Sequence, residues 1–346
     1  MSTATETIAQ PLAAASTAAA AEITLHTNQD DEFPVIDFGN LARDPEGTAA
    51  QIFEAACRWG FLVLKGHGIP KKDVDAMFAL SAEFFDQPSE IKAEKWMNQK
   101  QQGYDFKDWR DVPKRTQAEA FRSQCRNLSE SLLQTFARAM DLAPDFFTSA
   151  HSPDKDPGNV LRLIRYPALP APADPRFPRL GEHTDWGTLT LLFARTPGLE
   201  VRPPGDRGWV PAPVVEDAVI VNIADGLALW SGKALKSTMH RLSWDSLPYD
   251  MHRYSIAYFV NANADAPLKM LKGEVGSGGK YVEAPTEFAA TFGDYQAVRM
   301  RMIHEKFNTE GTEEDLKVDP AFVDMVKNIG VAHGTGVTFD GKGLEQ

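Results

Sequence analysis

The chain of 346 residues contains only two cysteines, Cys57 and Cys125. Two thiols cannot form the disulfide framework of a small secreted domain, so we expect both to be reduced and Cys57 to be buried in a helix. No apolar run approaches the roughly 18 residues needed to span a bilayer. The segment from Met1 to Ala21 also lacks the basic start and apolar centre of a signal peptide. The sequence therefore predicts a cytoplasmic protein without a membrane partner.

Basic clusters are missing as well. The 36 Lys and Arg residues are outnumbered by 48 Asp and Glu residues, which gives a formal net charge of −12. Proteins that bind nucleic acid attract its phosphates with a concentrated basic surface, so no nucleic acid partner is expected. The sequence has no internal repeats and gives no indication of oligomeric state. With 43% hydrophobic residues, it can bury a sizeable core in one large domain or two closely packed ones.

The first part of the chain divides into a tail and a helical region. Residues 1–31 are rich in Ala and Thr, which predicts a disordered tail. Residues 32–156 are predicted to be mostly helical and to pack around a catalytic barrel. Two short strands are expected on either side of a helix over 49–59, followed by helices over 72–85 and 122–140.

The second part has the pattern of a β-rich domain. Over residues 157–262, short β-branched and aromatic runs alternate with turns that contain Pro and Gly, which is typical of a jelly roll. Residues 263–346 are predicted to contain a loop over 273–279, a helix over 287–306 and then a polar tail. The predicted fold class is α+β, with a double-stranded β-helix (jelly-roll) core, a helical N-terminal region and a C-terminal helix.

Three side chains are candidates to hold one metal ion. His183 and Asp185 lie in Gly-Glu-His-Thr-Asp-Trp-Gly, and His240 lies in Lys-Ser-Thr-Met-His-Arg-Leu. Residues two apart on a strand face the same side, so His183 and Asp185 are predicted to point to one place, where a later strand brings His240. Two imidazoles and a carboxylate form the facial triad that leaves positions open on a non-haem Fe(II). These three are therefore predicted to be the metal ligands and the catalytic centre.

A second constellation follows on a predicted strand over residues 253–260. Arg253 and Ser255 share one face of it, and a buried guanidinium needs an anionic partner because an unpaired charge out of water is costly. Arg can hold a carboxylate through two parallel N–H bonds while Ser donates a third bond. The diacid 2-oxoglutarate fits this arrangement, since its keto acid can chelate iron while its other end reaches Arg253.

In this order, the motifs resemble the Fe(II)/2-oxoglutarate-dependent dioxygenases, specifically their isopenicillin N synthase-like branch. The resemblance covers about residues 33–305. Besides the residues above, it rests on four segments: Phe-Pro-Val-Ile-Asp-Phe at 33–38, Ala-Ala-Cys-Arg-Trp-Gly-Phe at 55–61, Gly-His-Gly-Ile-Pro at 66–70 and Arg-Tyr-Pro at 165–167. One departure affects the substrate side, because the stretch between Trp96 and Phe121 is shorter than in relatives.

The resemblance implies a non-haem iron oxidoreductase that uses Fe(II), 2-oxoglutarate and O2, with ascorbate as a stimulant. It implies hydroxylation of a small-molecule metabolite, with release of succinate and CO2, in secondary metabolism; desaturation and ring closure are other outcomes of the same chemistry. Arg253, Ser255 and Tyr166 are expected to bind 2-oxoglutarate, although Tyr166 has packing as its alternative role. Trp186 is expected to form a wall of the substrate site or to fill the core.

Two other functions remain open at this stage. An oxidase like isopenicillin N synthase would use the same triad without 2-oxoglutarate and would take all four electrons from its substrate. A catalytically inactive binding protein of the same fold is the other alternative. Dependence of turnover on 2-oxoglutarate separates the two enzymes, and iron content after anaerobic reconstitution tests for the inactive protein.

Overall fold

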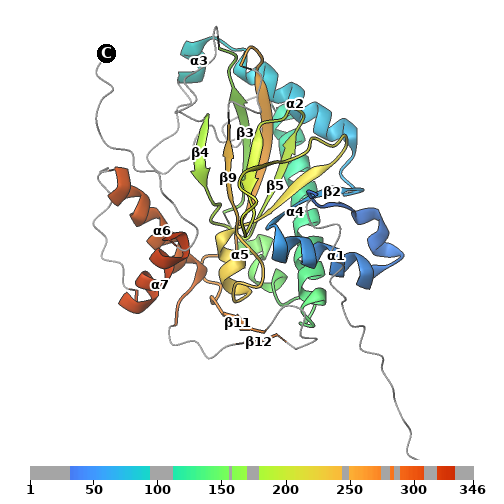
Figure 1. Ribbon diagram of the computed structural model, residues 1–346. Helices are drawn as coiled ribbons and strands as arrows, with labels where there is room; N and C mark the ends of the chain where they lie inside the picture. The colour runs from blue at the N-terminus through green and yellow to red at the C-terminus, as the bar shows by residue number, and fades with distance from the viewer. Residues whose placement is uncertain are drawn as a thin grey trace, which may run out of the picture.

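The computed structural model describes residues 32–93, 112–155, 158–169, 179–243, 249–273, 281–283, 289–307 and 318–331. Its core is a jelly roll of two sheets, with six strands in the order β1-β2-β8-β5-β10-β3 and four strands in the order β4-β9-β6-β7 (Figure 1). The predicted tail over 1–31 lies outside the described residues. So do most of the predicted loop over 273–279 and much of the stretch between Trp96 and Phe121.

The strands of the described residues are β1 (Val35–Asp37), β2 (Phe61–Lys65), β3 (Val160–Tyr166), β4 (Leu180–His183), β5 (Leu189–Ala194), β6 (Leu199–Arg202), β7 (Val210–Pro211), β8 (Val219–Ile223), β9 (Met239–Leu242), β10 (Arg253–Val260), β11 (Leu271–Lys272) and β12 (Val282–Glu283). The helices are η1 (Phe38–Ala42), α1 (Pro45–Arg58), α2 (Lys71–Phe85), α3 (Ser89–Ala93), α4 (Val112–Ala139), η3 (Thr148–Ala150), η4 (Pro153–Lys155), α5 (Asp225–Trp230), α6 (Phe292–Phe307) and α7 (Pro320–Val331).

The N-terminal region contributes strands to the six-stranded sheet as well as helices around it. β2 pairs antiparallel with β8, and β1 pairs parallel with β2. The prediction that residues 32–156 pack around the barrel is therefore wrong for β1 and β2, which are part of its larger sheet. Phe61–Leu64 is apolar on both faces and fully buried, so this strand has to be covered on both sides, and an interior place in the sheet provides that cover.

The helices α1, α2 and α4 pack on the outer face of the six-stranded sheet, where their apolar residues form one continuous core with β5, β8 and β10. The two inner faces enclose a second, smaller core that includes Phe61, Val201 and Leu242. Helix α4 begins at Val112, earlier than the predicted start at Arg122. Its first two turns are mainly polar, which hides the helical period of their apolar residues.

The C-terminal part contains a second helix that the sequence reading missed. A polar tail was expected after residue 306, but α7 packs against α6 beside the barrel (Figure 1). Phe322 and Val326 of α7 are buried, and their i, i+4 spacing puts them on one helical face. Pro320–Val331 is a short and mostly apolar segment, and an apolar run of this length does not by itself distinguish a buried helix from other structure. Within the described part of the chain, no helix is both long and apolar enough to cross a membrane.

One buried histidine ties the helical layer to the barrel. The Nδ1 of His151 lies 2.7 Å from the carbonyl oxygen of Phe147, and its Nε2 lies 3.0 Å from Oγ1 of Thr188. Burial lowers the pKa of His151 from its ordinary value of 6.5 to about 4. The folded protein therefore holds this imidazole neutral over a pH range in which the unfolded chain takes up a proton.

This difference predicts a loss of stability in mild acid. The contribution is fully present above pH 6.5 and declines as the pH falls towards 4, because only the unfolded state binds the proton in that window. At pH 5 the expected loss is about 2 kcal/mol. Urea unfolding at pH 7 and pH 5 measures it, and His151→Gln should reduce the difference between the two pH values. An equal difference in both proteins would assign the acid sensitivity to other groups.

Candidate metal centre and cosubstrate site

The structure brings the three predicted metal ligands together. His183 ends β4, His240 lies on β9, and the two are cross-strand partners. One ligand atom from each of His183, Asp185 and His240 lies within 4.8 Å of the other two. Oδ1 of Asp185 is 3.8 Å from Nε2 of His183 and 3.7 Å from Nε2 of His240. The three donor atoms therefore surround one point, as a shared metal ion requires.

Asp185 reaches this point by a route other than the predicted strand alternation. β4 ends at His183, and Asp185 lies in the turn that leads to β5. In this turn, the carbonyl oxygen of Asp185 accepts a hydrogen bond from the backbone N–H of Asp225, at 2.8 Å. The two ligands thus converge because the start of α5 fixes the turn, and the reasoning from a continuous strand was wrong at this position.

Both histidines are oriented for metal binding by their second ring nitrogen. Nδ1 of His183 lies 2.9 Å from the carbonyl oxygen of Gly181, and Nδ1 of His240 lies 3.2 Å from that of Thr238. A carbonyl oxygen only accepts, so each Nδ1 carries a proton and Nε2 is the ring nitrogen left to bind a metal ion. Burial, and then the neighbouring His183, lower the pKa of His240 to about 4.

Two polar side chains that the sequence reading missed orient the carboxylate. Oδ2 of Asp185 accepts hydrogen bonds from Oγ1 of Thr190, at 2.6 Å, and from Nδ2 of Asn222, at 2.7 Å. Oδ1 is thereby left to face the imidazoles. Thr190 and Asn222 are themselves cross-strand partners on β5 and β8, so the central sheet presents both donors to the metal turn. Two imidazole nitrogens and one oriented carboxylate oxygen fit Fe(II).

This orientation makes a specific prediction for Thr190→Val, which removes one hydrogen bond but keeps the shape of the side chain. Groups that orient a metal ligand typically account for about a tenfold to hundredfold effect on metal affinity. We expect the dissociation constant for Fe(II), measured anaerobically by equilibrium dialysis, to rise about tenfold. The urea midpoint should change little. An unchanged dissociation constant would show that Asn222 alone suffices to hold Asp185.

The site opens towards solvent at His183. Its side chain is 37% exposed, whereas those of Asp185 and His240 are 10% and 9% exposed. His240 packs edge-on against Phe61, with ring centroids 5.3 Å apart. The apolar inner core therefore closes one side of the triad, and a ligand has to approach from the side of His183.

Arg253 lies in the same barrel, at the start of β10, and is only 2% exposed. Its Nε donates to the carbonyl oxygen of Pro197, at 3.0 Å, and no acidic side chain of the described residues forms an ion pair with it. Burial lowers the pKa of Arg253, the nearby Arg179 lowers it further, and Tyr166 opposes both effects. A buried positive charge without a carboxylate partner favours an anionic ligand.

Tyr166 and Ser255 lie beside this guanidinium. Tyr166 is the cross-strand partner of Arg253 on β3, and Cζ of Arg253 lies 5.7 Å from the centre of its ring. Ser255 follows two residues after Arg253 and is also 2% exposed, so both side chains are on the buried face of β10. The structure thus groups the three predicted cosubstrate residues, and adds Arg179 as a second positive charge.

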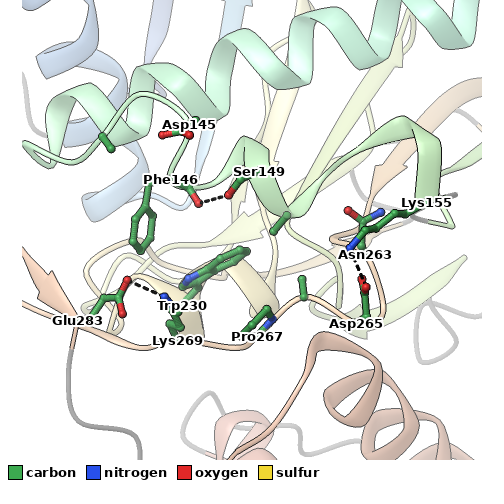
Figure 2. A pocket seen from close by; sticks show the side chains of 13 residues that line it. Asp145, Phe146, Ser149, Lys155, Trp230, Asn263, Asp265, Pro267, Lys269 and Glu283 are labelled. Atoms are coloured by element: carbon green, nitrogen blue, oxygen red, sulfur yellow. Dashed lines mark hydrogen bonds and ion pairs between the residues drawn. The ribbon is translucent and has the colours of Figure 1, made fainter.

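The pocket drawn in Figure 2 lies apart from these residues. It has a volume of about 310 Å³, and its lining includes Phe146, Trp230 and two ion pairs, Lys155–Asp265 and Lys269–Glu283. None of the metal ligands belongs to its lining. Trp230 is the last residue of α5, so the pocket and the metal turn lie at opposite ends of that helix.

Comparisons with known proteins agree with this geometry. Residues 33–147 match the family described as non-haem dioxygenase in morphine synthesis N-terminal, and residues 157–262 match the 2OG-Fe(II) oxygenase superfamily. UPF0676 protein C1494.01 of Schizosaccharomyces pombe is 35% identical, over 74% of this chain and 89% of that protein. The chain belongs to the 2OG-Fe(II) oxygenase superfamily.

A curated relative and a solved structure extend the similarity. The 2-oxoglutarate-dependent dioxygenase tropC of Talaromyces stipitatus is 26% identical, over 77% of this chain and 97% of that protein. Neurospora crassa T7H, solved with alpha-KG and 5-formyluracil, has a TM-score of 0.66 and 28% identity, over 78% of this chain and 96% of that chain. This member of the superfamily is therefore a 2-oxoglutarate-dependent dioxygenase, an oxidoreductase that uses Fe(II) and 2-oxoglutarate.

Trp186 follows directly after Asp185, the predicted carboxylate ligand, and its own contact with substrate stays a prediction. A large aromatic side chain next to the open side of the iron site would border a bound substrate. We expect Trp186→Ala to lower the ratio of product to succinate while the affinity for 2-oxoglutarate stays near that of the wild type. Quantifying both products in one reaction gives the ratio. If it does not change, Trp186 serves packing alone.

Proposed function

We propose that this dioxygenase hydroxylates a small organic molecule, with His183, Asp185 and His240 as the Fe(II) ligands. Arg253 and Ser255 bind the distal carboxylate of 2-oxoglutarate, and Tyr166 lines the same site. The observation that carries the proposal is the buried Arg253 guanidinium, which has no described carboxylate partner and lies in one barrel with a three-ligand metal cluster. A diacid can chelate the metal through its keto acid and pair with the Arg253 guanidinium through its second carboxylate.

Each side chain has a defined task in this reaction. Nε2 of His183, Nε2 of His240 and Oδ1 of Asp185 supply three ligand atoms, which leaves the remaining positions for cosubstrate and O2. Arg253 neutralises the distal carboxylate and fixes its orientation. Bound Fe(II) would supply the activation of O2, which is the oxidant: one oxygen atom would go to succinate as 2-oxoglutarate loses CO2, and the other to the substrate. The chain's own contribution is to hold the reacting carbon of the substrate at the open side, near His183.

The proposed substrate class follows from the names of similar proteins. Structures of Neurospora crassa T7H were solved with thymine and with 5-formyluracil, and a relative from Penicillium crustosum is named clavatol oxidase. These names support a compact organic substrate, and we place the reaction in secondary metabolism. Ascorbate is proposed to stimulate turnover by returning oxidised iron to Fe(II).

A metabolite screen tests the proposal. The Fe(II)-loaded protein is supplied with 2-oxoglutarate and O2, and succinate release is compared with and without each candidate compound. The proposal predicts that a substrate stimulates succinate release and that about one succinate forms per hydroxylated product, as the coupled chemistry requires. Product formation without 2-oxoglutarate would instead favour an oxidase of the isopenicillin N synthase type.

A further inference from the structure

The turn that carries Asp185 is held by the start of α5. The backbone N–H of Asp225 donates to the carbonyl oxygen of Asp185, and that of Gly226 donates to the carbonyl oxygen of Trp186, at 3.1 Å. The side chain of Thr184 donates from Oγ1 to Oδ2 of Asp225, at 2.9 Å. The position of the metal-binding carboxylate thus depends on where Asp225 lies.

Asp225 is in turn paired with a residue of the C-terminal region. Nη2 of Arg299, on α6, lies 2.8 Å from Oδ2 of Asp225, and the two side chains are 9% and 1% exposed. The same oxygen of Asp225 that accepts the hydrogen bond from Thr184 is therefore held by Arg299.

Arg299 touches the turn a second time, through an aromatic ring. Its Cζ lies 5.4 Å from the centre of the Trp186 ring, within the range of a cation–π contact. The packing around this contact is close, because a side-chain carbon at Gly226 would collide with the ring of Phe292 on α6 and with the carbonyl oxygen of Gly187. A shift of α6 would therefore be transmitted to Asp225 and to Trp186.

Stability alone gives a poor reason for this ion pair. A buried pair often contributes no more than apolar side chains of similar volume, because both charges lose their hydration. Here Nη1 of Arg299 and Oδ1 of Asp225 are buried and have no hydrogen-bond partner among the described residues, so the desolvation is only partly offset. The feature that apolar residues could not reproduce is the fixed geometry of Thr184, Asp185 and Trp186.

We propose that Arg299 is a positioning residue for the metal centre, acting through Asp225 on Asp185 and through the indole ring on Trp186. The inference rests on the proposed function, since it takes Asp185 as a metal ligand. In this proposal, α6 determines the geometry of the metal centre through Arg299, although the helix supplies no ligand.

Cobalt binding to the full-length chain tests this role. Co(II) is titrated anaerobically in the presence of 2-oxoglutarate, and its visible absorption bands report both affinity and ligand geometry. Arg299→Leu is expected to raise the dissociation constant about tenfold and to shift the bands, in keeping with other groups that orient ligands. Arg299→Lys should recover part of the affinity because it keeps the charge. Arg301→Leu, an exposed position on the same helix, is the matched control and should bind like the wild type.

Three outcomes decide between the accounts. An Arg299→Leu protein that melts at a lower temperature but binds Co(II) with wild-type affinity and spectrum would overturn the positioning role. If Arg299→Leu does not fold, Arg299→Gln replaces it, since its amide still donates to Asp225, and the same test then requires a rise of at least about threefold. His183→Ala in the same titration tests the proposed function separately. Wild-type Co(II) binding by this variant would exclude His183 as a ligand and contradict the proposed metal centre.

Discussion

Arg253→Leu is expected to raise the apparent dissociation constant for 2-oxoglutarate tenfold or more. The variant removes the buried guanidinium and with it the two charge-assisted hydrogen bonds that we propose to the distal carboxylate, and a loss of roughly 1.4 kcal/mol already gives a factor of ten. The affinity for Fe(II) should hardly change, because Arg253 is not a ligand in this account. Arg253→Lys should rescue only part of the loss, since an ammonium group cannot reproduce the planar fork.

Arg165→Leu is a suitable control for this experiment. Arg165 lies on the neighbouring strand β3 and pairs with the exposed Asp86, at 2.9 Å, so its loss removes the same charge and a similar volume on the opposite face of the strand from Tyr166. We expect this variant to bind 2-oxoglutarate like the wild type. An equal loss in both variants would point to a general effect of net charge. Wild-type affinity in Arg253→Leu would exclude Arg253 from the cosubstrate site.

Replacing His183, Asp185 or His240 with Ala is expected to abolish turnover and to weaken Fe(II) binding by about a hundredfold or more. Each change removes one of the three proposed protein ligands, a larger loss than removing a group that merely orients one. Metal content after anaerobic reconstitution and succinate release together measure the effect. A variant that keeps wild-type activity would show that the replaced residue is not a ligand.

Among these three variants, His183→Ala gives the clearest result. Its side chain is the most exposed of the three, at 37%, so its removal should disturb the core least. Asp185→Ala also leaves Thr190 and Asn222 without their shared acceptor, and His240→Ala opens a gap beside Phe61. We therefore expect His183→Ala to keep the urea midpoint of the wild type while it loses the metal.

The chemistry of the site can be predicted from the sequence where the residue types are themselves unusual in their setting. His183, Asp185 and His240 form a recognisable set of ligand types, and Arg253 with Ser255 places a charge on a strand that is otherwise apolar. The structure groups each set in space. What these residues do depends mainly on their own donor atoms, so their types and order are informative.

The supporting residues could not be predicted in the same way. Thr190, Asn222 and Arg299 are ordinary residues for a strand or a helix, and they reach the site only because β5, β8 and α6 meet there. Asn222 is 37 residues from the carboxylate it orients. Such contacts follow from the packing of the sheets, which no local pattern encodes.

The errors in the fold have a similar origin. The short apolar segment of α7 is recognisable as a helix only where it packs against α6. The place of β1 and β2 in the sheet could not be predicted because β1 pairs with β2, and β2 pairs with β8 across much of the chain. The turn at Asp185 was read as a strand, although α5 bends the chain there. In each case a long-range contact determined the local structure.

The most direct test of the central claim is an anaerobic equilibrium titration with 2-oxoglutarate, in the presence and absence of Fe(II), of the wild type, His183→Ala and Arg253→Leu. The account predicts one Fe(II) and one 2-oxoglutarate per wild-type chain, with tight cosubstrate binding only when the metal is present. His183→Ala should lose both ligands, whereas Arg253→Leu should keep the metal and lose most of its affinity for 2-oxoglutarate. Binding of 2-oxoglutarate that needs neither Fe(II) nor Arg253 would contradict it.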